Sequence, residues 1–446
     1  MKKSLLVLLT LSLCVMIDSV VVAQQSAVDY FDNGITKSKA GDFPAALQAF
    51  SMAITMNPEN AACYYNRGLA KANLKDHRGA IMDYDRAIEL NPKDGLAYLS
   101  RGVSKAKQED DRSAQLDFSR AIELNPDDPQ AYYSRGISRS KLVQYRGALL
   151  DFNRTIELDA ANVSAFYARG ITKQKLGDFT GSLADLSKVI EITPKRAQAY
   201  ASRGASKLEL NDFSGAVADL NKAIELSPED GDSYYNRGFA KSKLGDFKAA
   251  FSDYDRAVAL NGANYRAFYG RGFAKSKLGD QKGAIQDFNS AIEINNVDVG
   301  AKVVYSGKLT RSVLDDLRNA VQERNKINEL SPERAEAYYT RGVSRNKQGD
   351  VKGALIDLNK SIELSPTYAE AYFTRGMIRS AQGDQRAALQ DCNSAVKLNP
   401  RYSEAFYVRG LIRHSLGDEN GGCLDLSKAG ELGYTPAYKV ISDYCN

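Results

Sequence analysis

VSAFYARGITKQKLGDFTGSLADLSKVIEITPKR, residues 163–196, is a 34-residue unit that recurs with changes along nearly the whole chain. The recurrence is clearest in a glycine that follows Arg and returns every 34 residues, with one shift of register: Gly68, Gly102, Gly136, Gly170, Gly204, Gly238, Gly272, Gly342, Gly376 and Gly410. A fixed period of this length is typical of a solenoid, in which each unit buries its apolar face against its neighbours. We therefore expect an all-α fold in which each unit forms a helix, a turn and a second helix.

The period divides the chain almost completely. Counted from Ala27, eight units fill residues 27–298, residues 299–300 interrupt the period, and four more units fill residues 301–436. We expect the remaining residues to be a signal peptide at 1–23, a short leader at 24–26 and a C-terminal capping helix at 437–446. This division leaves no room for a separate catalytic domain.

Within each unit, the sequence marks where the helices end. Positions 1–14 read as helix A and positions 18–31 as helix B. Position 15 is often Gly, which suits the left-handed backbone at the end of a helix. Position 16 is Asp in eleven units, where the carboxylate would cap helix B. Proline near position 32 then ends helix B.

These positions resemble the tetratricopeptide repeat family, whose 34-residue pattern carries an aromatic residue, Leu-Gly, Tyr, Ala, Phe and Pro in turn. The second unit matches this pattern with Tyr64, Arg67-Gly68, Lys71, Ala80, Tyr84 and Pro92. The resemblance implies a right-handed superhelix in which positions 2, 5, 9, 12 and 13 of helix A face an inner groove. This sequence departs from the family at two places, since Arg replaces Leu at position 7 and Lys or Arg commonly replaces Tyr at position 11.

Arg at position 7 and Asp at position 23 occur together in ten units and are absent together from the other two. This joint presence predicts that the two side chains touch, because a partly buried Arg without its carboxylate would cost roughly 3–5 kcal/mol. We expect structural ion pairs such as Arg169–Asp185 and Arg237–Asp253. The alternative interpretation is a basic stripe that binds phosphate or nucleic acid.

The ninth unit, residues 301–334, departs most from the pattern. It has Lys308 in place of the glycine at position 8 and Arg324 where the other units carry an aromatic residue, Leu or Cys. We hypothesise a kink or looser packing near residues 296–312, which would act as a hinge between eight repeats and four. The alternative is sequence drift, which a linear array tolerates because each unit contacts only its neighbours.

The sequence indicates no enzyme, cofactor or metal site. The two histidines, His77 and His414, lie in different units, and no metal-ligand spacing, phosphate-binding loop or nucleophile elbow is present. The carboxylates recur at the repeat period as caps and ion-pair partners rather than as a catalytic pair.

The cysteines fall into two groups. Cys63 takes a position that is usually Ala, and Cys392 replaces the large residue at position 24, so we expect both to be buried thiols. Cys423 lies on the last helix B and Cys445 near the end of the C-terminal tail. In an exported protein a disulfide between them would hold the capping helix in place and contribute roughly 3 kcal/mol.

The N-terminus has the plan of a secretory signal peptide. Two lysines precede an apolar run from Leu5 to Ile17, and a Val-Val-Ala sequence ends at Ala23, where we expect cleavage. This run is shorter than the roughly 18 residues of a membrane-spanning helix, so we expect no integral span in the mature chain. We predict a periplasmic or extracellular protein; an uncleaved N-terminal anchor and lipidation of Cys14 are the alternatives. The net charge of +5 is small for 446 residues and argues against nucleic acid as a partner.

The strongest functional signal lies on helix A. Position 5, which the resemblance places in the groove, is aromatic in most units, including Tyr65, Tyr133, Tyr167, Tyr235, Tyr269, Tyr305, Tyr339, Phe373 and Tyr407. Position 13 is often lysine, including Lys141, Lys175, Lys243 and Lys277. We predict a scaffold for envelope assembly or secretion whose groove binds a protein or peptide segment, with the lysines favouring acidic side chains. One alternative is a polysaccharide stacked on the tyrosines, and another is that position 5 only packs between adjacent A helices.

Overall fold

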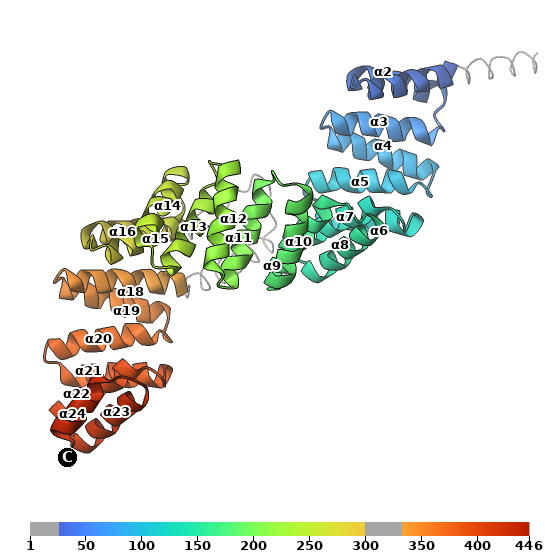
Figure 1. Ribbon diagram of the computed structural model, residues 1–446. Helices are drawn as coiled ribbons and strands as arrows, with labels where there is room; N and C mark the ends of the chain where they lie inside the picture. Colours follow the sequence, from blue (N-terminus) through green and yellow to red (C-terminus); the bar gives the residue numbers. More distant parts are fainter. Residues whose placement is uncertain (1–25, 299–331, 446) are drawn as a thin grey trace, which may run out of the picture. The chain divides into compact units, whose positions relative to one another are not determined.

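The computed structural model describes residues 26–298 and 332–445, and every regular element in these residues is helical. The chain folds into two compact units, Met1–Leu210 and Asn211–Asn446. Within each unit, successive helices pack side by side in the order of the sequence, as helix A and helix B of one repeat after another (Figure 1). The predicted all-α repeat fold is confirmed.

The first unit starts with a helix at residues 26–39. Its further helices are α2 (Phe43–Met56), α3 (Ala61–Asn73), α4 (His77–Leu90), α5 (Gly95–Lys107), α6 (Asp111–Leu124), α7 (Pro129–Lys141), α8 (Tyr145–Leu158), α9 (Val163–Lys175), α10 (Phe179–Ile192) and α11 (Ala197–Glu209). Odd-numbered helices in this unit are A helices and even-numbered helices are B helices.

The second unit contains the remaining helices on both sides of residues 299–331. These are α12 (Phe213–Leu226), α13 (Gly231–Lys243), α14 (Phe247–Leu260), α15 (Tyr265–Lys277), α16 (Gln281–Asp298), α18 (Pro332–Lys347), α19 (Val351–Leu364), α20 (Ala369–Ala381), α21 (Gln385–Leu398), α22 (Ser403–Ser415), α23 (Glu419–Glu431) and α24 (Pro436–Tyr444). Across the two described ranges, no helix is both long and apolar enough to cross a membrane.

The turn between helix A and helix B follows the predicted capping residues. In the unit quoted above, helix A ends at Lys175, and Gly177 adopts the left-handed backbone with φ of +79°. The Asp178 carboxylate then accepts a hydrogen bond from the backbone N–H of Gly181 at 2.8 Å. Helix B therefore starts at position 17, one residue before the predicted start, because the aspartate at position 16 is its N-cap.

The fourth repeat lacks both of these local signals. Val143 replaces the glycine and is held at φ of +61°, a region that a β-branched residue rarely adopts. Gln144 replaces the capping aspartate, and its side chain makes no capping hydrogen bond to α8. The turn nevertheless forms, because the helices on either side pack against each other.

The glycine at position 8 makes room for the side chain at position 24. A Cβ atom added to Gly136 would lie 2.6 Å from the ring atom Cε1 of Phe152, far inside van der Waals contact. Phe152 itself is fully buried between α7 and α8. The recurrent Arg-Gly pair therefore marks the closest approach of helix A to the large side chain of helix B.

Residues 299–331, with most of the predicted ninth unit and its hinge, lie outside the described residues. On either side of them, α18 packs directly against α16 and α15. The Arg341 guanidinium donates a hydrogen bond to Asn289 on α16 at 2.9 Å, which is the contact that Arg169 makes with Asn153 of the preceding repeat at 2.9 Å. The tenth predicted unit thus contacts the eighth in the way that consecutive repeats contact each other elsewhere.

The last helix, α24, closes the C-terminal end of the second unit. Its buried residue Ala437 packs against α23, and the Tyr438 hydroxyl donates a hydrogen bond to the backbone carbonyl of Gly430 at 3.0 Å. Cys423 on α23 and Cys445 after α24 form a disulfide, with Cα atoms 5.7 Å apart. The disulfide and the packing together cover the end of the array.

Candidate interaction groove

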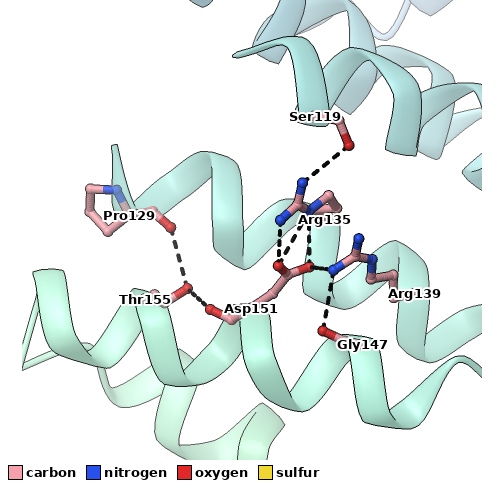
Figure 2. Close-up of polar contacts among 7 residues, drawn as sticks. All are labelled: Ser119, Pro129, Arg135, Arg139, Gly147, Asp151 and Thr155. Atoms are coloured by element: carbon pink, nitrogen blue, oxygen red, sulfur yellow. Dashed lines mark hydrogen bonds and ion pairs between the residues drawn. The ribbon is translucent and has the colours of Figure 1, made fainter. Parts of the chain in front are cut away.

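In nine repeats, the arginine at position 7 pairs with the aspartate sixteen residues later on helix B of its own repeat. Figure 2 shows this for the fourth repeat, where Arg135 reaches Asp151 through two nitrogens, at 3.1 Å for Nε and 2.7 Å for Nη2. Asp151 is only 3% exposed. The same two-pronged contact occurs in the pairs Arg67–Asp83, Arg101–Asp117, Arg169–Asp185, Arg237–Asp253, Arg271–Asp287, Arg341–Asp357, Arg375–Asp391 and Arg409–Asp425.

Two further partners complete this ion-pair network, and sequence reasoning missed both. The cation at position 11 contacts the same carboxylate, as Arg139 does with Asp151 at 2.8 Å (Figure 2). The third nitrogen of the Arg135 guanidinium donates to Ser119 of the preceding repeat at 3.1 Å. The signal for this contact was in the sequence, because position 25 is Ser, Asn or Asp wherever an arginine follows sixteen residues later.

The ion-pair network gives the arginines a structural position. The Arg135 side chain is 16% exposed, and its charge is balanced by a buried carboxylate at hydrogen-bond distance. A guanidinium held in this way has few donors left for a ligand phosphate. The contacts therefore favour the predicted ion pairs over a basic stripe for phosphate or nucleic acid.

The aromatic residues at position 5 are half-buried. Most pack at a tilt against an aromatic ring of helix B or of the next repeat; the ring centroids of Tyr133 and Phe152 lie 6.0 Å apart, and those of Tyr269 and Phe288 lie 5.7 Å apart. Similar pairs are Tyr65–Tyr84, Tyr235–Tyr254, Tyr339–Tyr368 and Tyr407–Tyr434. These residues therefore pack the interior as well as line the face of helix A.

Hydroxyl groups at position 5 also link adjacent A helices. The Tyr167 hydroxyl lies 3.4 Å from that of Ser202, and the Tyr269 hydroxyl lies 3.2 Å from that of Thr340. Phe373 corrects the predicted set of contact residues, since it is only 8% exposed with its ring against Tyr402. Tyr305 lies outside the described residues.

The predicted lysines of the groove are exposed at position 13 of helix A. Lys141 pairs with Asp111 of the preceding repeat at 3.4 Å. Lys243 and Lys277 instead lie over the rings of Phe239 and Phe273, with the ammonium nitrogen 5.2 Å and 5.3 Å from the ring centroids. This is the geometry of a cation–π contact, which leaves the rest of the ammonium group open to a ligand.

The structure brings four of the predicted groove residues together around one cavity in the second unit: Tyr235, Tyr269, Lys243 and Lys277. The cavity has a volume of about 560 Å³ and lies on α13 and α15, with contributions from α14, α16 and α18. Its other walls include Phe239, Phe247, Tyr254, Tyr265, Arg266, Gly270, Phe273, Ile292, Arg334, Glu336 and Ala337. The predicted residues Tyr65, Tyr133, Tyr167, Tyr339, Tyr407, Lys141 and Lys175 do not line this cavity.

Tyr269 is a buried titratable group of the cavity. Burial raises the pKa of Tyr269 well above its usual value, and the nearby Glu336 carboxylate raises it further. Its hydroxyl therefore stays neutral and able to donate a hydrogen bond. Among the described residues, no group of three or more His, Cys, Asp or Glu side chains has the arrangement of a metal site.

The two free cysteines of the described residues, Cys63 and Cys392, are buried and do not line this cavity. Burial raises the pKa of the Cys63 thiol to about 11 and that of the Cys392 thiol to about 12. Neither thiol is a nucleophile near neutral pH, because the thiolate form is not populated there.

Comparison with known proteins points to one family. Models of the tetratricopeptide repeat match residues 61–94, 231–264, 265–298, 335–368 and 358–390, and a model described as TPR repeat matches residues 204–245. Four of these ranges coincide with units drawn from the 34-residue period alone. A search of curated protein sequences found no match.

Solved structures with similar folds are also tetratricopeptide repeat proteins. YrrB, described as having an unusual peptide-binding site, is 26% identical over 42% of this chain and 96% of its own, with a TM-score of 0.39. A repeat protein from Parabacteroides merdae is 21% identical over 58% of this chain and 99% of its own, with a TM-score of 0.42. MamA from Desulfovibrio magneticus is 20% identical over 38% of this chain and 96% of its own, with a TM-score of 0.37. The repeat period, the helix pairs and the family matches at the same boundaries show that this chain is a tetratricopeptide repeat protein.

Proposed function

We propose that this protein is a non-enzymatic scaffold that binds a peptide segment of a partner protein on its helix A face. The observation that carries this proposal is the cavity on α13 and α15, where half-buried aromatic rings form the walls and exposed lysines form the margin. Ligand pockets in proteins are mostly apolar, with a few polar groups that fix orientation. The cavity has this composition.

A peptide suits this surface better than a small metabolite does. Aromatic side chains give a large contact area, and their polar tips can bond a peptide backbone. Position 5 is aromatic and position 13 is lysine on several A helices of each compact unit, so a longer segment meets the same chemistry again. The cavity is then one subsite of an extended surface.

The proposed place of action is the cell envelope, after export, in assembly or secretion. The N-terminal sequence supports export, since it has the charged, apolar and small-residue regions of a signal peptide. The disulfide between Cys423 and Cys445 supports it as well, because such bonds persist in oxidising compartments. Finding the protein in the cytoplasmic fraction with its leader intact would contradict this part of the proposal.

The groove is tested by charge reversal at exposed lysines, because removing half-buried tyrosines would also disturb packing. The variant K175E/K243E/K277E changes position 13 of three A helices. Its matched control, K248E/K282E/K352E, makes the same charge change at exposed lysines on three B helices. Each protein serves as bait for envelope extract. We expect partners held by the wild type and the control to be lost by the helix A variant; equal capture by all three would refute the groove.

The alternative ligand is an envelope polysaccharide. The rings of Phe239 and Phe273 in the cavity favour it, because sugars stack on aromatic faces. The lysines over these rings then require an acidic polysaccharide. The same three baits distinguish the two ligands, since treating the extract with protease removes a protein partner and leaves a polysaccharide.

A further inference from the structure

We propose that the cavity on α13 and α15 is a specificity pocket for a bulky apolar side chain, preferably aromatic, with carboxylate side chains on either side of it in the bound peptide. This inference deepens the proposed function and rests on it. It assigns to one place in the array a preference that the other repeats do not share.

The apolar preference comes from position 9 of helix A. The seventh and eighth repeats carry Phe239 and Phe273 at this position, whereas all other repeats carry Ile, Leu, Val, Ala or Met. Phe247 at the start of α14 packs edge-on against Phe273, with ring centroids 6.1 Å apart. These three rings, with Tyr235 and Tyr269, give this cavity more aromatic wall than the neighbouring repeats can form.

The shape of the cavity depends on Gly270 at position 6. This is the only glycine at that position in the chain; the other units carry Ser, Asn, Thr, Asp, Ala or Val. A Cβ atom added to Gly270 would lie 2.6 Å from the ring of Tyr254, which is itself 2% exposed. The missing side chain therefore lets the Tyr254 ring form part of the wall where another residue would displace it.

The cavity is large enough to hold one bulky side chain of a bound peptide together with atoms of the residues on either side of it. Pockets for small ligands in proteins have volumes of about 300–1,000 Å³, and this one has about 560 Å³. The cavity spans two consecutive A helices and reaches α18 through Ala337. An extended segment that crosses the A helices can place one large side chain inside it.

The preference for carboxylates comes from the basic side chains at the edge and in the walls of the cavity. Lys243 and Lys277 are exposed, stack on Phe239 and Phe273, and have no ion-pair partner among the described residues. Arg266 and Arg334 add positive charge to the walls, and Glu336 is the one acidic residue among those lining the cavity. A ligand with acidic residues beside its apolar side chain would complement this charge, and a basic ligand would be repelled.

The test uses labelled peptides with both ends blocked, so that no terminal carboxylate can substitute for a side chain. The central peptide has the sequence Gly-Glu-Glu-Phe-Glu-Glu-Gly, and its analogues carry Ala for Phe or Lys for every Glu. We measure binding to the purified protein by fluorescence anisotropy at several salt concentrations. The proposal expects binding of the central peptide, at least about tenfold weaker binding of the Ala analogue, and no binding of the Lys analogue.

Two variants place the binding in the cavity. F239L/F273L introduces leucine, which the second and twelfth repeats already carry at position 9, so the fold should be retained. K243E/K277E removes the positive margin. Each should weaken binding of the central peptide at least about tenfold, while K248E/K282E, the same charge change at exposed lysines of α14 and α16, should leave it unchanged.

The outcomes separate this inference from the proposed function. Binding of the central peptide that neither F239L/F273L nor K243E/K277E weakens, while partner capture still depends on the helix A lysines, would overturn the specificity pocket and leave the helix A groove standing. Failure of all the peptides to bind, while partner capture still depends on the helix A lysines, would also overturn the pocket alone. An acidic polysaccharide that binds the wild type but not K243E/K277E, while no peptide binds, would overturn both the specificity pocket and the proposed peptide-binding function.

Discussion

The side chains that hold one repeat to the next form a shared ion-pair network. The Asp185 carboxylate accepts hydrogen bonds from Arg169 and forms an ion pair with Lys173. Arg169 also donates a hydrogen bond to Asn153 of the preceding repeat. One buried carboxylate thus holds two cations from helix A, and one of these cations reaches back to the neighbouring repeat. The network replaces the apolar Leu and the Tyr that other tetratricopeptide repeats carry at these two positions.

Replacing the buried carboxylate should be costly. Asp185→Asn leaves Arg169 and Lys173 partly buried without a counter-charge, and we expect the free energy of unfolding to fall by about 3–5 kcal/mol. Asn153→Ala removes one contact at the edge of the same network and should cost about 1 kcal/mol. Urea denaturation compares the two. Equal stability of Asp185→Asn and the wild type would mean that the aspartate is not needed to balance these cations.

The buried thiols should be unreactive in the folded protein. Because burial raises the pKa of Cys63 to about 11 and of Cys392 to about 12, iodoacetamide at pH 8 should modify neither until the protein is unfolded. The usual thiol pKa is 9.0, so the unfolded chain ionises first. These two residues therefore contribute stability below pH 9, and that contribution is lost as the pH rises from 9 toward 12. Rapid alkylation of native protein at pH 8 would contradict this.

At the scale of single residues, the sequence predicted pairs of contacting side chains better than it predicted the full set of residues that line the cavity. Joint presence and absence within the chain identified Arg169 and Asp185, because two side chains that stabilise each other are kept together. The role of Lys173 could not be identified in this way, because position 11 is Lys or Arg in all twelve repeats, including the two that lack the aspartate. The approach of Gly270 to Tyr254 could not be identified either, because it joins two repeats whose relative placement the period does not define.

The helices and turns depend mainly on local signals. Gly177 and Asp178 set the end of one helix and the start of the next, and the structure follows them to within about one residue. The exceptions are α16, which continues to Asp298, and α18, which starts at Pro332, three residues before its repeat. Asn296 replaces the usual proline at the end of α16, but Ala160 and Gly262 replace it after α8 and α14, which end at Leu158 and Leu260, so the missing proline alone does not explain the extension.

The turn of the fourth repeat can be improved by giving it the residues of the others. Val143 is 67% exposed, so Val143→Gly loses little packing and removes a strained backbone position, and Gln144→Asp adds the missing cap. We expect each change to raise the free energy of unfolding by about 1 kcal/mol. The reverse changes at Gly177 and Asp178 are the control and should lower it. A double variant V143G/Q144D less stable than the wild type in urea would contradict this.

The closing helix depends on its disulfide. The variant C423S/C445S should lose roughly 3 kcal/mol from the C-terminal end of the second unit, and α24 should become sensitive to protease while α20 and α21 stay protected. Reduction of the wild type should have the same effect. Equal cleavage rates at α24 with and without the disulfide would show that packing of Ala437 and Tyr438 is sufficient.

On the scale of the whole molecule, the period predicted how many units the chain contains but could not predict which units touch. The period places the ninth repeat between the eighth and the tenth in sequence. In the structure, α18 packs on α16 through Arg341 and Asn289, across a gap of 52 residues in sequence. A repeat count is a property of the sequence, whereas contact between repeats depends on where each apolar face finds a partner.

This arrangement predicts that residues 299–334 can be removed. Joining Asp298 to Ala335 restores the 34-residue spacing between Gly272 and Gly342. Because α18 already contacts α16, we expect the shortened protein to keep its helix content and a cooperative thermal transition within a few degrees of the wild type. The comparison is a deletion of the eleventh unit, residues 369–402, which removes packed helices. Loss of amide-exchange protection in α18 after removal of residues 299–334 would refute this.

The most direct test of the account is to ask which face of the array touches a partner. A photo-crosslinking amino acid is placed at one of two exposed positions, Lys243 on helix A or Ile356 on helix B, in cells that make the full chain. The account predicts a crosslink to a protein from Lys243 and none from Ile356. A crosslink from Ile356 alone would show that the partner binds the helix B face and would contradict the helix A groove.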